Sequence, residues 1–117
     1  MAEVVRLSSG TPRPTYQVAS TDTAQSLAAA KITQTKTTGD SAGVHASEAQ
    51  RAVITVESDE IRVAFNTDPT ENGGTGLGHI FFAKAVIVLE GAPAVKGFRF
   101  VSADAGSHAN LQVTVEF

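Results

Sequence analysis

The sequence has no cysteine and no tryptophan, and it has a single tyrosine, Tyr16. Without cysteine the chain cannot form a disulfide, use a thiolate nucleophile or build the usual structural zinc site, and its redox compartment stays open. Aromatic side chains that could stack on a ligand are also scarce, which disfavours a carbohydrate-binding module. The absence of cysteine therefore excludes a thiol-based function.

Excess positive charge and long apolar runs are absent as well. The formal net charge is -3, so the chain has no basic field that would attract nucleic acid or anionic lipid. No stretch approaches the roughly 18 apolar residues of a membrane span. The start, "MAEVVRLSSG", lacks the charged start and apolar segment of a secretion signal. We expect no nucleic-acid partner, no membrane partner and no export.

The length of 117 residues favours one domain with one core. Residues 1–50 are rich in Ser, Thr and Ala and poor in large apolar side chains, so they bury little surface to offset their ordering entropy. They predict an extended N-terminal arm with short strands or a short helix. "STDTAQSLAAAKI" fits either the helix or an extended strand. Residues 51–117 are expected to form the core.

A period-2 alternation of apolar and polar residues dominates the second half and is typical of half-buried strands. In "EIRVAFN" the expected inward set is Ile61, Val63 and Phe65, with Arg62 and Ala64 on the opposite face. The same pattern recurs in "RAVITVE", "GFRFV" and "LQVTVEF". The spacing predicts an all-β fold, an antiparallel β-sandwich of five or six short strands.

The segment "HIFFAKAVIVLEG" at 79–91 differs because its "AVIVL" portion is apolar at every position. Such a run is typical of a strand that is covered on both faces. We expect one cover to be the opposing sheet, and the other to be a further element or another subunit.

The loop "FNTDPTENGGTGLGH" at 65–79 has the glycines of a phosphate cradle. It lacks the lysine and the following helix that such cradles need, since a strand pattern comes next. Its oxygen donors could form a weak calcium site, although the spacing of a calcium loop is absent. The candidates are Asp68, Glu71 and Asn72. The sequence favours no metal and no cofactor, and a turn connection in which Asn72 and its neighbouring glycines take positive φ angles.

No catalytic constellation stands out. The three histidines, His45, His79 and His108, lie in different segments without a ligand pair at helical spacing, although a convergent three-histidine site stays open. No serine stands in a G-x-S-x-G elbow. The acidic "ESDE" at 57–60 is expected to be a solvated turn. We expect no catalytic residues and a protein that is not an enzyme.

Two stretches carry a resemblance: "ITVESDEIRVAFNTDPTENGGTGLGHIFFAKAVIVLEG" and "VKGFRFVSADAGSHANLQVTVEF". Over roughly residues 51–117 the chain resembles small bacteriophage virion structural proteins of the capsid cement or decoration type. The resemblance implies a jelly-roll-like sandwich that binds the major capsid protein and stabilises the shell. It also implies a place on the capsid surface of the virion, with assembly in the cytoplasm of a bacterial host.

A cement protein covers neighbouring subunits, and an N-terminal arm that orders on contact suits that role. We expect a homo-oligomer, a dimer or a trimer. The expected protein-interface residues are Val4, Val5, Leu7, Tyr16, Val86 and Val88. Two alternatives stay open: a phage tail or neck structural component, and a carbohydrate-binding β-sandwich module.

Overall fold

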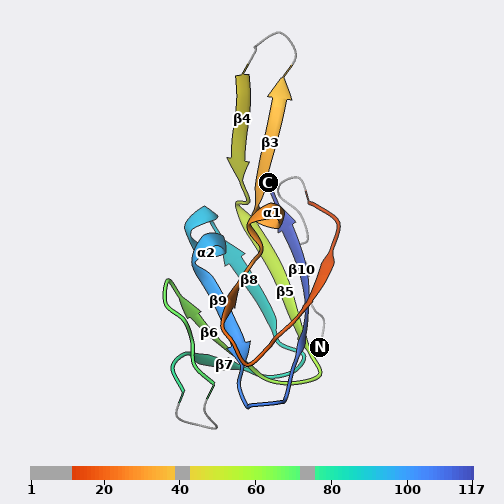
Figure 1. Cartoon of the computed structure of the whole chain (residues 1–117). Helices are drawn as coiled ribbons and strands as arrows, with labels where there is room; N and C mark the ends of the chain where they lie inside the picture. The colour runs from red at the N-terminus through yellow and green to blue at the C-terminus, as the bar shows by residue number, and fades with distance from the viewer. Residues whose placement is uncertain (1–11, 39–42, 72–75) are drawn as a thin grey trace.

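The computed structural model describes residues 12–38, 43–71 and 76–117, and for residues 34–38 and 43–46 it describes the backbone only. The chain is mostly β, as the alternation predicted, with two antiparallel sheets of four strands each. A two-stranded hairpin and two short helices complete the described part of the fold (Figure 1). The all-β prediction is confirmed.

The first sheet has the strand order β1-β10-β5-β8. Its strands are β1 (Tyr16–Ala19), β10 (Asn110–Glu116), β5 (Arg51–Glu57) and β8 (Val86–Glu90). The central pair is in register from Asn110 opposite Glu57 to Glu116 opposite Arg51. Because side chains alternate between the two faces of a strand, this register puts the apolar set of each strand on one common face.

The second sheet has the strand order β2-β9-β6-β7. Its strands are β2 (Gln25–Ser26), β9 (Phe98–Ser102), β6 (Ile61–Phe65) and β7 (His79–Phe81). Helix α2 (Ala92–Gly97) leads directly into β9, where the sequence indicated only a turn. Pro93 lies in its first turn, a position at which the missing N–H of proline costs nothing.

Both sheets contribute side chains to one hydrophobic core. Phe98 and Phe100 of β9 are fully buried, with ring centroids 5.8 Å apart. Ile54 of β5 and Leu111 of β10 contribute from the first sheet. Truncating one of these aromatic side chains to alanine is expected to cost about 3–5 kcal/mol, because a cavity is left in a close-packed interior.

The segment before residue 51, expected as an arm, is largely built into the sheets where the structure describes it. β1 pairs with β10 and β2 pairs with β9, so this segment supplies one edge strand to each sheet. Leu27 and Ala49 are buried in the core. The pairing partners lie 70 to 100 residues away in the sequence, so no local pattern could indicate them.

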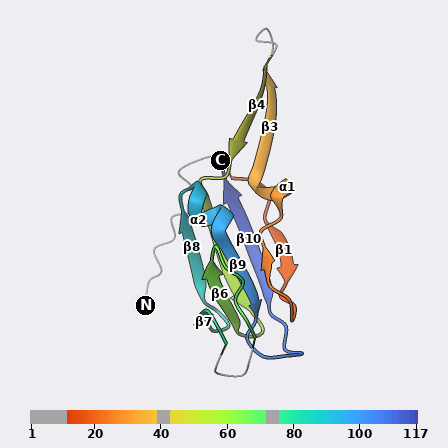
Figure 2. The same cartoon turned by 60° about the vertical axis from the view of Figure 1, so that its left-hand side comes forward.

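The helix expected within "STDTAQSLAAAKI" is reduced to α1 (Ala29–Ile32). After it the chain forms the hairpin of β3 (Thr33–Thr38) and β4 (Gly43–Glu48), in register from Thr33 opposite Glu48 to Thr38 opposite Gly43. This hairpin points away from the two sheets (Figures 1 and 2). It is the described part of the N-terminal half that comes nearest to the expected arm.

Candidate functional site

The glycine-rich loop at 66–78 closes over Arg62. This side chain was expected on a solvent-facing side of β6, but the residue is buried. Its Nη1 donates to the carbonyl oxygens of Gly76 at 3.0 Å and of Gly78 at 3.1 Å. The described part of the loop therefore points carbonyl oxygens at the Arg62 guanidinium. A phosphate-binding loop would instead point N–H groups at an anion.

Close approach explains the glycines in this loop. A Cβ on Gly76 would lie 2.0 Å from the carbonyl oxygen of Thr70, and Gly78 has a φ of +121°. Thr70 also closes the loop across to Leu77, through backbone N–H to O at 3.0 Å and Leu77 N–H to Thr70 Oγ1 at 2.7 Å. The described residues of the loop thus pack over β6. The positive φ angles expected at Asn72 and its neighbouring glycines fall outside the described residues.

The two metal candidates that the structure describes, Asp68 and Glu71, have different partners. Asp68 forms an ion pair with Arg99 of β9 at 2.8 Å. Glu71 instead faces Asp22, and desolvation, a hydrogen bond to Asp22 and its negative charge raise the pKa of Glu71. Asn72 lies outside the described residues. Within the described ranges no three His, Asp or Glu side chains are arranged to hold a metal ion.

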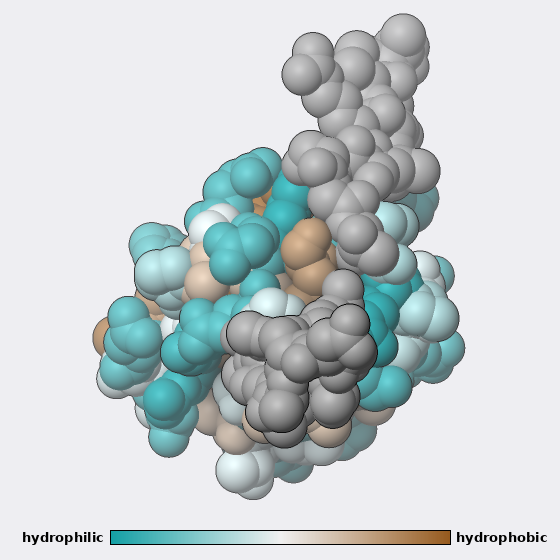
Figure 3. Space-filling view, turned by 90° about the horizontal axis from the view of Figure 1, so that it is seen from above, coloured by the Kyte–Doolittle hydropathy of each residue, from teal (hydrophilic) through white to brown (hydrophobic). Residues whose placement is uncertain are grey.

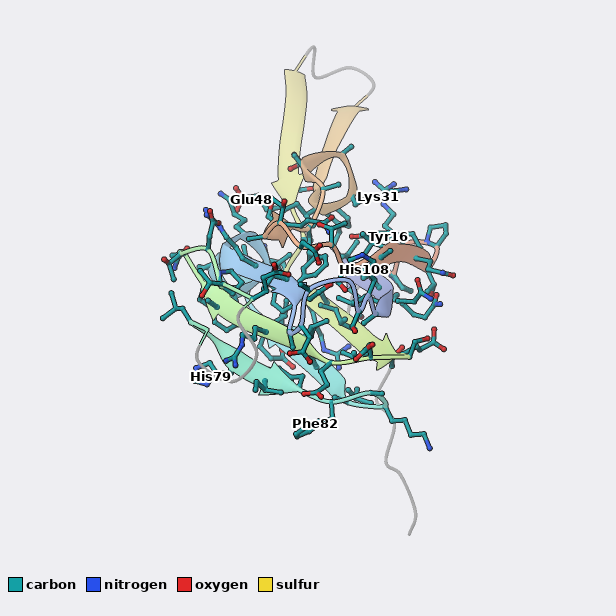
Figure 4. All side chains as sticks on the ribbon, turned by 60° about the horizontal axis from the view of Figure 1, so that its bottom comes forward. Tyr16, Lys31, Glu48, His79, Phe82 and His108 are labelled. Atoms are coloured by element: carbon teal, nitrogen blue, oxygen red, sulfur yellow. The ribbon has the colours of Figure 1, made fainter. Side chains whose placement is uncertain are left out.

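The histidines are also apart. His79 begins β7 and is exposed, whereas His108 lies in the loop before β10 (Figure 4). His45 is in the projecting strand β4, and its side chain lies outside the described part. His108 Nδ1 is 2.9 Å from Ser102 Oγ and 3.9 Å from Asp22 Oδ1. The expected separation of the histidines thus holds for His79 and His108.

Ser102, whose hydroxyl contacts His108, is part of a buried hydrogen-bond network that joins two chain segments. Ser102 Oγ is 2.8 Å from Ser20 Oγ, which accepts a hydrogen bond from the N–H of Ala109 at 2.8 Å. Both serines are fully buried. They satisfy one another's polar groups where the β1–β2 connection meets the β9–β10 loop, and they are closed to a substrate in this conformation.

The described surface is most unusual in its exposed apolar side chains. Six large ones are between 40% and 65% exposed. They are Phe65, Leu77, Ile80, Phe82, Val86 and Val88. All six lie between the end of β6 and the middle of β8. By contrast, the surface seen from the hairpin end is mainly hydrophilic (Figure 3).

Val86 and Val88, two of the expected interface residues, lie on the outer face of β8. They are 58% and 44% exposed, while Ile87 and Leu89 face the core. Among the described residues only one face of β8 is covered, so they include no further element that supplies the expected second cover, and cover by another subunit stays a prediction. Val88 is opposite Val53 of β5 in the register. The two valines thus border a small apolar area on the outer face of the first sheet.

The other expected interface residues have different surroundings. Tyr16 is half-buried against the core, with Lys31 Nζ 5.1 Å from its ring centroid, and burial raises the pKa of its phenol. Val4, Val5 and Leu7 lie outside the described residues.

Four of the exposed apolar residues were not expected from the sequence, and for one of them, Phe65, the prediction of an inward side chain was wrong. Ile80 is on β7 and Phe82 follows that strand, at the edge of the second sheet. Phe65 and Leu77 line a shallow apolar groove of about 410 Å³ beside His79. The sequence indication for Ile80 and Phe82 was the run of consecutive apolar residues in "HIFF". Because this run does not alternate with polar residues, the period-2 pattern could not assign its side chains to a buried or an exposed face.

β8 is an edge strand among the described residues, because the sheet order ends with it. On its inner side the carbonyl of Ala85 accepts from Val56 N–H at 3.0 Å, and the N–H of Gly91 donates to Gln50 at 2.6 Å. Backbone groups of an antiparallel strand alternate in direction. The groups of Val86, Val88 and Glu90 therefore point away from β5, toward the free edge.

In the described part of the chain, no helix has the length and apolar character needed to cross a membrane. Comparisons with protein-family models, with curated proteins and with solved structures give no match for this chain. The function must therefore be argued from the residues and their geometry.

Proposed function

We propose that this chain is a non-enzymatic bacteriophage virion structural protein, a capsid cement or decoration protein that binds the major capsid protein and stabilises the shell. The observation that carries the proposal is the exposure of Val86 and Val88 on β8, an edge strand of the first sheet. Large apolar patches on a small protein typically mark contact with another protein. The resemblance of residues 51–117 to phage cement proteins gives the class of partner.

We further propose that the two sheets form a jelly roll. Counting the eight sheet strands in chain order without the hairpin β3–β4, the first pairs with the eighth, the second with the seventh, the third with the sixth and the fourth with the fifth. A long antiparallel hairpin that is rolled into two facing sheets gives this set of pairs. The jelly roll is an architecture found in viral capsid domains.

The outer face of the first sheet suits a contact with the shell. The middle of this face has uncharged side chains, with Thr55 opposite Gln112 and Val53 opposite Thr114, and its charged residues lie at the two ends of the strands. A specific interface needs about 800 Å² from each partner, an apolar centre and a polar rim. The valines of β8 would form the centre, and the threonine and glutamine side chains would lie around it.

The proposal is tested with empty shells assembled from the major capsid protein that is encoded with this chain. Purified protein is added, and bound copies per shell and the melting temperature of the shell are measured. We expect saturation at on the order of hundreds of copies, as repeated shell symmetry requires, and a higher melting temperature. A double variant, Val86→Ser with Val88→Ser, should bind at least about tenfold more weakly, because burial of each valine contributes about 1.5–3 kcal/mol.

The matched control is Gln17→Ser with Ala19→Ser, on exposed positions of β1 at the opposite edge of the same sheet. It should bind like the unchanged chain. If the unchanged chain does not bind shells, the cement function is wrong. A few to dozens of copies in purified particles would instead favour the tail or neck component. Equal binding by both double variants would show that β8 does not face the shell.

A further inference from the structure

The free edge of β8 has the features of a self-complementary strand. Val86, Val88 and Glu90 direct their free backbone groups outward, and no other described strand pairs there. Edge strands that stay unpaired are usually protected by proline, by an inward charge or by being very short. β8 has five residues and no proline. It lies at the outer edge of the molecule (Figure 2).

We propose that a second copy of this chain pairs with β8 along this edge, antiparallel about a two-fold axis at Ile87. In that register Val86 of each copy lies opposite Val88 of the other. Both residues have outward backbone groups, so the two copies can exchange about four backbone hydrogen bonds. The result is a continuous eight-stranded sheet across the two copies, and the contact is closed because each copy contributes the same surface.

Charge selects this register over its neighbours. With the axis at Ile87, Glu90 at the end of β8 in each copy comes beside the turn before β8 of the other copy, and this turn carries Lys84. Two opposite-charge contacts can therefore form at the ends of the pairing. An axis one residue later, at Val88, would place Lys84 opposite Ala92 and leave Glu90 opposite Val86. A parallel arrangement in register would bring the like charges of Glu90 side by side, which is destabilising.

The other edge strands of the two sheets are poorer templates, since β1 has four residues and follows Pro12 and Pro14, and β2 has only two residues. β7 has three residues, His79 to Phe81, and short edge strands resist pairing. Pairing at β8 also has a consequence for the outer face, because it joins the exposed valines of two copies into one apolar surface. In that respect the inference rests on the proposed function, since the joined surface would face the shell. The pairing itself is tested in solution without any shell.

The test is sedimentation equilibrium of the full chain, with a charge-exchange pair of variants. In Lys84→Glu, residues 84 and 90 are both acidic, so like charges meet at both ends of the contact. In Glu90→Lys, both residues are basic, and like charges meet again. Each variant alone should associate at least about tenfold more weakly than the unchanged chain, and an equimolar mixture should regain dimers, because every end pair is again of opposite charge. Circular dichroism confirms that each variant is folded.

A second pair of variants tests the backbone contact independently of charge. Val88→Pro removes an outward N–H that β5 does not use, whereas Gln17→Pro removes the corresponding outward N–H on β1. Only Val88→Pro should abolish the dimer. A chain that stays monomeric, a trimer, a mixture that does not regain dimers, or equal effects of the two proline variants would each overturn the inference. Loss of shell binding by a normal dimer would contradict the proposed function alone.

Discussion

The ion pair between Arg51 of β5 and Glu116 of β10 permits a sharp test of how the first sheet is stabilised. The two residues lie opposite each other in the register, and their side chains are only 13% and 2% exposed. The hydrogen bond to the Glu116 carboxylate raises the pKa of Arg51 above its usual value, so the guanidinium stays charged. Removing one member of a buried pair leaves the other charge without its partner in a poorly solvated place.

The change is Glu116→Leu, which removes the charge and both acceptor oxygens. Such a loss costs about 3–5 kcal/mol in a buried pair. Glu90 also accepts from Arg51 Nε, at 3.3 Å, so the guanidinium keeps one carboxylate after the change. We therefore expect a loss near the lower end, about 3 kcal/mol, and a melting temperature lower by roughly 10–15 °C for a domain of this size.

Urea unfolding followed by circular dichroism measures the loss. The control is Glu90→Leu, because the Glu90 side chain is 73% exposed and an exposed pair contributes less than about 1 kcal/mol. Adding Arg51→Met to Glu116→Leu should recover most of the stability, since an apolar pair replaces the charged one. If Glu116→Leu and Glu90→Leu reduce the free energy of unfolding by the same small amount, burial does not determine how much the Arg51–Glu116 pair contributes to stability.

Two further predictions concern the loop that covers β6. Gly76→Ala should lower the free energy of unfolding by about 1–3 kcal/mol in urea, because its Cβ would lie 2.0 Å from the Thr70 oxygen. Gly106→Ala, whose Cβ meets open space at a φ of +78°, should cost about 1 kcal/mol; an equal or larger loss there would contradict the packing argument. The raised pKa of Glu71 means that folding favours the protonated side chain. The stability gained in this way is complete below about pH 4.5, and it is lost as the pH rises through the pKa of the folded state. Glu71→Gln should thus be more stable than the unchanged chain at pH 7 and equal to it at pH 4 in urea unfolding, and a gain of the same size at both pH values would refute this.

Alternation in the sequence was sufficient to predict the fold class and the buried faces of β5 and β10, but on β6 it was wrong for Phe65, expected inward and 45% exposed, and for Ala64, expected on the other face and buried. Ile54, Leu111 and Val113 face the core as the period-2 pattern indicated. Arg62 was expected to be exposed but is buried, because the loop that covers it comes from 14 to 16 residues later in the sequence. The integration of β1 and β2 was missed for the same reason, since a strand's partner is set by tertiary contacts that leave no trace in its own composition.

The candidate interface was predictable only in part. Val86 and Val88 were found because the run around them is apolar at every position. Ile80 and Phe82 were missed because 79–91 was interpreted as one strand. In the structure a turn after β7 carries the chain from one sheet to the other, with Lys84 at a φ of +75°. A non-glycine residue in that conformation is uncommon, and no residue type in "FAKA" signals it.

The composition of the outer face shows that the exposed valines are not required by the fold of a single chain. In line with Val86 the neighbouring strands have polar residues, Thr55 on β5 and Gln112 on β10, whereas the residue opposite Val88 is Val53. A strand with one buried face needs apolar side chains only at alternate positions, which Ile87 and Leu89 already supply. Burial of Val86 and Val88 against another chain would add about 1.5–3 kcal/mol for each side chain, a contribution that is unavailable to the isolated copy. The proposed contact with a shell or with a second copy would account for the outward valines of β8.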